Sequence, residues 1–176
     1  MRVLVALFLA CLILVPPSIA DTYVVDPYGT GDYPTIQAAV NACVSGDIIE
    51  LTDGVFTGAG NRDIRFNNRD LTIRSQSGDP TRSIIDCELA EQAFVLFDGD
   101  EEHIQGLTMT HGRDSAWGGA VYMGMAAHGV FLDCIFTNNS APGNAGAVMI
   151  MDCAYAEFEG CTFIGNSSYA GGAVCT

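Results

Sequence analysis

The sequence predicts an all-β fold, a single-stranded parallel β-helix with about 27 residues per coil and a short N-terminal capping helix. Two repeats in the sequence predict it. Apolar residues recur every 27 positions in three segments that align without gaps, in the sets Ile104, Phe131, Phe158 and Met109, Phe136, Phe163. Gly-Gly-Ala-Val at 118–121 and 171–174, and Ala-Gly-Ala-Val at 145–148, recur in step. A fixed period of this size is typical of a solenoid, whose units stack because none buries its apolar face alone.

Residues alternate within each repeat as they do in a β-strand. Leu107 and Met109 are expected to face inward and Thr108 outward, and the same pattern returns around Cys134 and Cys161. Short strands of this kind, separated by turns rich in Gly, Asn, Ser and Asp, are typical of β-helix coils. At this period, the segment 47–176 provides nearly five coils.

The first 20 residues have the pattern of a secretory signal peptide. Arg2 precedes an apolar run from Val3 to Val15, and Ser18 and Ala20 are the small residues of a cleavage site, so cleavage is predicted after Ala20. A membrane-spanning helix is the alternative, but it needs about 20 apolar residues. We therefore expect an exported protein without a transmembrane helix in the mature chain.

Residues 21–46 differ from the repeats and are expected to form an N-terminal cap. Apolar residues lie on one face of a predicted helix from Thr35 to Cys43, with Pro34 before it and Ser45-Gly46 after it. Such a helix is well placed to cover the apolar cross-section of the first coil. The coils are assigned to residues 47–176.

The composition excludes several classes of function. The chain has seven cationic residues, all of them arginine, and 21 acidic residues, so its formal net charge is −14. Nucleic-acid binding needs a basic surface and is therefore not expected. Disorder is disfavoured because 49% of the residues are apolar.

Two pairs of polar residues share the 27-residue spacing. Asn139 and Asn166 are expected to form a ladder of hydrogen bonds in a turn. The alternative is glycosylation, since acceptor patterns are present at Asn138-Asn139-Ser140 and Asn166-Ser167-Ser168. The shared 27-residue register favours the ladder. Cys134 and Cys161 should lie on adjacent coils about 4.8 Å apart. They form either a disulfide or a stack of buried thiols.

Two known families share motifs with this sequence. The segment GTGDYPTIQAAVNA at 29–42, followed by GDIIELTDGVF at 46–56, resembles the cap and first coil of the pectin-lyase-like superfamily, which implies a right-handed β-helix. The Gly-Gly-Ala-Val motifs, together with FTNN at 136–139 and FIGN at 163–166, resemble polymorphic outer membrane protein repeats. That resemblance implies a secreted or surface-exposed protein that carries a C-terminal barrel or another sorting domain. Since the sequence stops at GGAVCT, inside a repeat, we interpret it as truncated at the C-terminus.

Two groups of polar residues are candidate sites. His111, Arg113 and Asp114 lie in one turn and are the best catalytic candidates, although a solvated turn is the favoured interpretation. Asp98, Asp100, Glu101 and Glu102 offer carboxylates to a hard cation such as calcium, although such acidic turns are usually solvated. No other cofactor is expected.

Two functions remain open at this point. The favoured hypothesis is a non-catalytic secreted or cell-surface segment, adhesin-like or a scaffold, with a glycan or another cell-surface molecule as partner. The alternative is the N-terminal part of a carbohydrate-active enzyme, a polysaccharide lyase, a hydrolase or a pectinesterase-like enzyme, whose catalytic coils are missing. The first is favoured because the acidic residues do not align at the 27-residue spacing and there is no lysine to act as a base.

Overall fold

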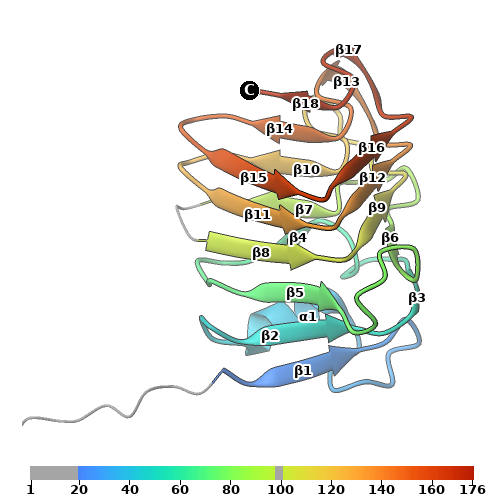
Figure 1. Ribbon diagram of the computed structural model, residues 1–176, viewed down its shortest axis with the longest axis vertical. Coiled ribbons are helices and arrows are strands. Elements are labelled where there is room, and N and C mark those ends of the chain that lie inside the picture. The colour runs from blue at the N-terminus through green and yellow to red at the C-terminus, as the bar shows by residue number, and fades with distance from the viewer. Residues whose placement is uncertain (1–19, 98–100) are drawn as a thin grey trace, which may run out of the picture.

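The computed structural model describes residues 20–97 and 101–176. The chain winds into a parallel β-solenoid with strands stacked in three main sheets (Figure 1). The first sheet contains β1 (Thr22–Val25), β2 (Ile48–Leu51), β5 (Thr72–Ser75), β8 (Glu101–Gln105), β11 (His128–Leu132) and β15 (Tyr155–Glu159). The second contains β3 (Gly54–Phe56), β6 (Ser83–Asp86), β9 (Thr108–Thr110), β12 (Ile135–Thr137) and β16 (Thr162–Ile164). The third contains β4 (Ile64–Arg65), β7 (Phe94–Leu96), β10 (Val121–Met123), β14 (Val148–Ile150) and β18 (Val174–Cys175).

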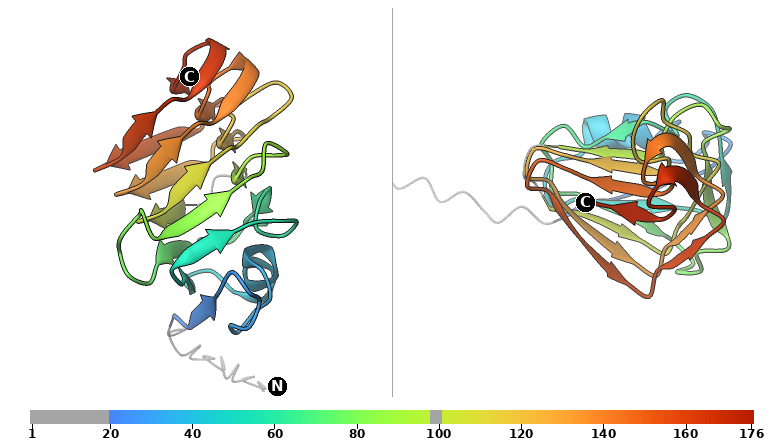
Figure 2. Two further views of the ribbon diagram at one scale, coloured as in Figure 1. Left: turned by 90° about the vertical axis from the view of Figure 1, so that its right-hand side faces the viewer. Right: turned by 90° about the horizontal axis from the view of Figure 1, so that it is seen from above.

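The predicted period is confirmed in the coils that begin at β8, β11 and β15. Ile104 pairs with Phe131 and Phe131 with Phe158, always in parallel register. The earlier coils differ, since Ile48 pairs with Thr72 and Thr72 with His103, so that one coil is shorter than the period and the next is longer. Figure 2 shows that these coils still follow one path around the solenoid axis. The differences in length are therefore absorbed by the connecting turns.

The core runs along the inside of the solenoid as stacks of equivalent side chains. Leu107, Met109, Cys134 and Phe136 are fully buried, as the alternation predicted. The rings of Phe136 and Phe163 are nearly parallel, with centroids 4.6 Å apart. Aromatic stacking between coils thus adds to the burial of apolar area in the core.

The predicted capping helix is present as α1 (Ile36–Ala42), with Thr35 and Cys43 as its end caps. The Thr35 hydroxyl accepts a hydrogen bond from the Ala38 N–H at 3.2 Å, which satisfies one of the free donors of the first turn. Ile36, Ala39 and Val40 form the buried face. Because α1 contacts β1, β2 and β4, it lies where the first coil needs to be covered.

A stack of loops lies between the second and third sheets, and we call it the ledge (residues 111–119, 138–146 and 165–172). The first two residues of each Gly-Gly-Ala-Val or Ala-Gly-Ala-Val motif end a ledge loop. Its last two loops contain β13 (Ser140–Asn144) and β17 (Ser167–Ala170), a two-stranded parallel sheet at the top of Figure 1. A Cβ on Gly119 would collide with the carbonyl of Gly146, and a Cβ on Gly146 with that of Gly172. The second glycine of the motif is therefore required by close approach between neighbouring coils.

One outward position differs from its prediction. Thr108 was expected in solvent but is 7% exposed, because its hydroxyl donates a hydrogen bond to Pro80 O in the β5–β6 connection at 2.7 Å. The predicted signal peptide lies almost wholly outside the described residues. Within the described part of the chain, no helix is long and apolar enough to cross a membrane.

Candidate functional site

An asparagine ladder anchors the ledge, as the spacing of Asn139 and Asn166 predicted. Asn139 is fully buried, and its Oδ1 accepts a hydrogen bond from Gly112 N at 2.7 Å in the preceding coil. Its Nδ2 donates to Met109 O and to Asn166 Oδ1, both at 3.0 Å. Asn166 repeats the arrangement by donating to Phe136 O at 2.9 Å. The side chains thus hold three consecutive coils at the start of the ledge.

The ledge loops stack in register and place polar side chains in columns. Arg113 pairs with Ser140 as an isolated parallel bridge, and Ser140 pairs with Ser167 in the next coil. Trp117 pairs with Asn144 in the same way. Side chains at equivalent positions of parallel strands point to the same side. One column therefore contains a guanidinium followed by two hydroxyls.

A groove of about 350 Å³ lies on this column. Its lining includes the Arg113–Ser140–Ser167 column, Pro142, Ser168 and Tyr169. Tyr169 is 92% exposed. The groove therefore combines a cation, hydroxyls and an open aromatic ring.

The predicted catalytic candidates occupy one turn but point to different partners. His111 Nδ1 lies 3.1 Å from Asp86 Oδ1 in the preceding coil. Asp114 Oδ2 accepts hydrogen bonds from the N–H groups of Ala116 and Trp117, both at 2.6 Å, and so shapes the turn itself. Arg113 faces the groove. Within the part of the chain that the structure describes, no hydrogen bond or ion pair joins these three side chains.

The acidic run proposed for calcium is described only in part, because Asp98 and Asp100 lie outside the described residues. Glu101 is exposed on β8, whereas Glu102 is fully buried, because adjacent residues of a strand face opposite sides. Glu101 Oε1 lies 2.9 Å from His103 Nε2. Among the described residues, no group of three or more His, Cys, Asp or Glu side chains is arranged to hold a metal ion. Calcium binding stays a prediction.

Sequence reasoning missed a column on the outer face of the first sheet. Glu101, His128 and Tyr155 stand opposite one another on β8, β11 and β15. The rings of His128 and Tyr155 stack with centroids 3.9 Å apart, and the Tyr155 hydroxyl lies 2.9 Å from His128 Nδ1. The signal was available, since these positions share the spacing of the repeats.

Cys134 and Cys161 are free thiols that follow the predicted stack. Their sulfurs lie near main-chain carbonyls of preceding coils, at 3.4 Å from Ile104 O and 3.3 Å from Phe131 O, respectively. A hydrogen bond from Cys134 lowers the pKa of the Cys161 thiol to about 7. The same interaction, together with burial, raises the pKa of Cys134.

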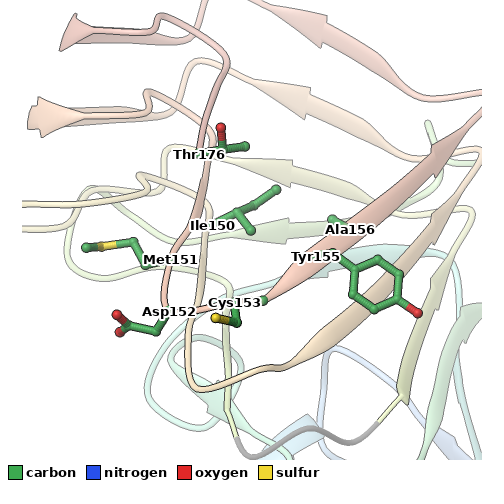
Figure 3. A pocket seen from close by; sticks show the side chains of 8 residues that line it. Ile150, Met151, Asp152, Cys153, Tyr155, Ala156 and Thr176 are labelled. Atoms are coloured by element: carbon green, nitrogen blue, oxygen red, sulfur yellow. The ribbon is translucent and has the colours of Figure 1, made fainter.

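A second hollow, of about 410 Å³, lies at the turn between β14 and β15 (Figure 3). Met151, Asp152, Cys153 and Thr176 are among its lining residues. Cys153 is an exposed free thiol. Asp152, Cys153 and Tyr155 line it together, but no hydrogen bond joins their side chains among the described residues.

The comparisons with known proteins point to one repeat family. A model of the Chlamydia polymorphic membrane protein repeat matches residues 133–150. The matched segment contains β12, the ledge loop with Asn139, and β14. No curated protein and no solved structure gives a match. The repeat match indicates a surface-exposed repeat protein.

Proposed function

We propose that this chain is an exported β-solenoid segment, displayed at the outer membrane or cell surface, that acts by binding as an adhesin-like or scaffold module. The observation that carries the proposal is the use of the repeated residues. Phe136, Asn139 and Gly146, all inside the matched repeat, serve to stack one coil on the next. Residues between the repeated positions differ from coil to coil and supply the exposed surface.

The charged side chains support a binding role over catalysis. Arg74 and Glu50 form an ion pair of 2.6 Å between adjacent coils, and Arg82 and Asp53 form another of 2.6 Å. Carboxylates held in this way hold neighbouring coils together, whereas acid and base catalysis needs carboxylates that converge on one substrate.

The export and display steps are tested in cells that produce the protein. Terminal sequencing of the secreted or displayed protein is expected to begin at Asp21. Protease treatment of intact cells is expected to remove the epitopes of antibodies raised against residues 21–176, while a cytoplasmic protein survives as the control. Retention of Met1, or protection of the epitopes until the cells are permeabilised, would contradict the proposal.

The binding role is separated from the enzyme alternative by direct incubation with polysaccharides. The chain is expected to release neither new reducing ends nor unsaturated sugars from neutral or acidic polysaccharides. Release that is lost in the double variant His111→Ala and Asp86→Ala would instead favour the carbohydrate-active enzyme.

A further inference from the structure

We propose that the ledge groove binds the terminal sugar of a glycan through that sugar's carboxylate, with Arg113 as the anion-binding residue. The proposal deepens the proposed function, on which it rests, because it assigns a ligand class to the displayed solenoid. The groove of about 350 Å³ is large enough for one or two sugar rings.

Arg113 is the first element of the argument. Among residues 20–97, four arginines form ion pairs with carboxylates, namely Arg62, Arg65, Arg74 and Arg82. A fifth, Arg69, donates to a main-chain carbonyl. Within the described ranges, the guanidinium of Arg113 has no hydrogen-bond or ion-pair partner. The nearby carboxylate of Asp114 already accepts two hydrogen bonds from main-chain N–H groups. Arg113 therefore offers its planar donors to a ligand, and a carboxylate fits them in bidentate fashion.

Hydroxyl groups continue the site beyond Arg113. Ser140 and Ser167 follow it at equivalent positions of the next two coils, about 4.8 Å apart. Neither hydroxyl has a protein partner among the described residues. Ser168 differs, because its hydroxyl donates to Ala170 O at 2.7 Å and is held within its own loop. Two hydroxyls next to a guanidinium match the ring hydroxyls and carboxylate of an acidic sugar.

Tyr169 supplies the apolar part of the site. Its ring stands 92% exposed beside the two serines, with Pro142 on the same lining. An aromatic ring with a polar tip packs against the C–H face of a sugar and also donates a hydrogen bond. The groove offers no deep apolar hollow for the side chains of a peptide, and for this reason a sugar is favoured.

The net charge of the whole chain restricts further the class of ligand that the groove can bind. At a formal net charge of −14, the chain repels a polyanion, whereas a single carboxylate can be held by one arginine. The site therefore favours a glycan that ends in one acidic sugar over a polyuronate.

The test is calorimetric titration of the chain with two oligosaccharides, one ending in sialic acid and one in glucuronic acid. Each is compared with the same oligosaccharide after reduction of its carboxyl group to an alcohol. At least one acidic form is expected to bind, and its reduced form to bind about tenfold more weakly, which corresponds to the loss of one charge-assisted contact. Absence of binding by both, or equal binding of acidic and reduced forms, would overturn the proposal.

Matched variants locate the site. Arg113→Gln is expected to weaken binding about tenfold, while Arg65→Gln, at another exposed arginine, leaves it unchanged. Tyr169→Ala is expected to weaken binding severalfold. Its control is Tyr28→Ala, because Tyr28 is 88% exposed but lies at the opposite end of the solenoid. Far-ultraviolet circular dichroism checks that each variant is folded. Equal loss in target and control variants would place binding elsewhere on the surface and overturn the proposal.

A peptide ligand is tested in the same titration. A short acidic peptide that displaces the bound oligosaccharide at equal concentration would show recognition of peptides and refute the sugar assignment. Failure of any of these titrations leaves the protease result on intact cells unaffected, so the ligand class and the display function are judged separately.

Discussion

Replacing Asn139 by Ala removes a side chain that ties three consecutive coils together. Asn139 accepts a hydrogen bond from Gly112 N and donates to Met109 O and Asn166 Oδ1, and the side chain is fully buried. At a net value of about 1 kcal/mol for each buried hydrogen bond, Asn139→Ala lowers the free energy of unfolding by about 3 kcal/mol. Urea unfolding followed by circular dichroism measures the change, which shifts the midpoint by more than about 1 M for a typical urea dependence.

Two further variants make this measurement specific. Asn138→Gly removes the neighbouring exposed amide at a residue with φ 55°, where glycine is unstrained, and is expected to leave the midpoint unchanged. Asn166→Ala also removes three side-chain hydrogen bonds, but Asn166 is half-buried and water replaces part of them, so the expected loss is about 1 kcal/mol. If Asn139→Ala proves as mild as Asn138→Gly, the ladder does not hold the coils together.

Three other substitutions or reactions probe separate features of the fold. Gly146→Ala forces a Cβ against the carbonyl of Gly172 and is expected to lower the stability of the protein by about 3 kcal/mol or more, measured by thermal unfolding. The control is Gly172→Ala, whose Cβ would lie 3.3 Å from Asn166 O and which is expected to have a small effect. Equal effects of the two variants would contradict the argument that the coils approach closely at Gly146. Cys161 is expected to react with iodoacetamide at a rate that rises with pH through about pH 7, as its thiolate forms, while Cys134 stays protected until unfolding. Peptide mapping by mass spectrometry distinguishes the two cysteines. Faster labelling of Cys134 in the folded chain would show that Cys134, and not Cys161, is the more reactive thiol. Thr35→Ala removes the N-cap of α1 and is expected to lower the stability of the protein by about 1 kcal/mol in thermal unfolding. Thr22→Ala on β1 is the control, and identical melting of the two variants would show that the cap is dispensable.

The sequence was most informative where one type of residue performs the same task in successive coils. Phe136 and Phe163 stack on each other, and Asn139 and Asn166 share hydrogen bonds, so their shared spacing was enough to place them. The capping helix was predicted to within one residue at each end, because Thr35 and the apolar face are local signals.

Features that depend on the lengths of turns could not be predicted. The shortened and lengthened coils before β8 break the period, since a turn can lengthen without disturbing the strands that it joins. Thr108 is buried by a connection whose path only the fold determines. The groove brings together Arg113, Ser140 and Tyr169 from three coils. Arg113 and Ser140 share the 27-residue spacing, but the spacing alone does not show that their loops enclose a groove beside Tyr169.

The asparagine ladder makes the last two repeats equivalent in how each joins the coil before it. Each asparagine donates its side-chain amide to the same main-chain position of the coil before it, Asn139 to Met109 O and Asn166 to Phe136 O. A gain or loss of one complete repeat at Asn139 or Asn166 would therefore restore the hydrogen bonds of the ladder across the new junction. A gene encoding such a chain could change the length and the outer surface of the rod by recombination between repeats, with the interior left as it was.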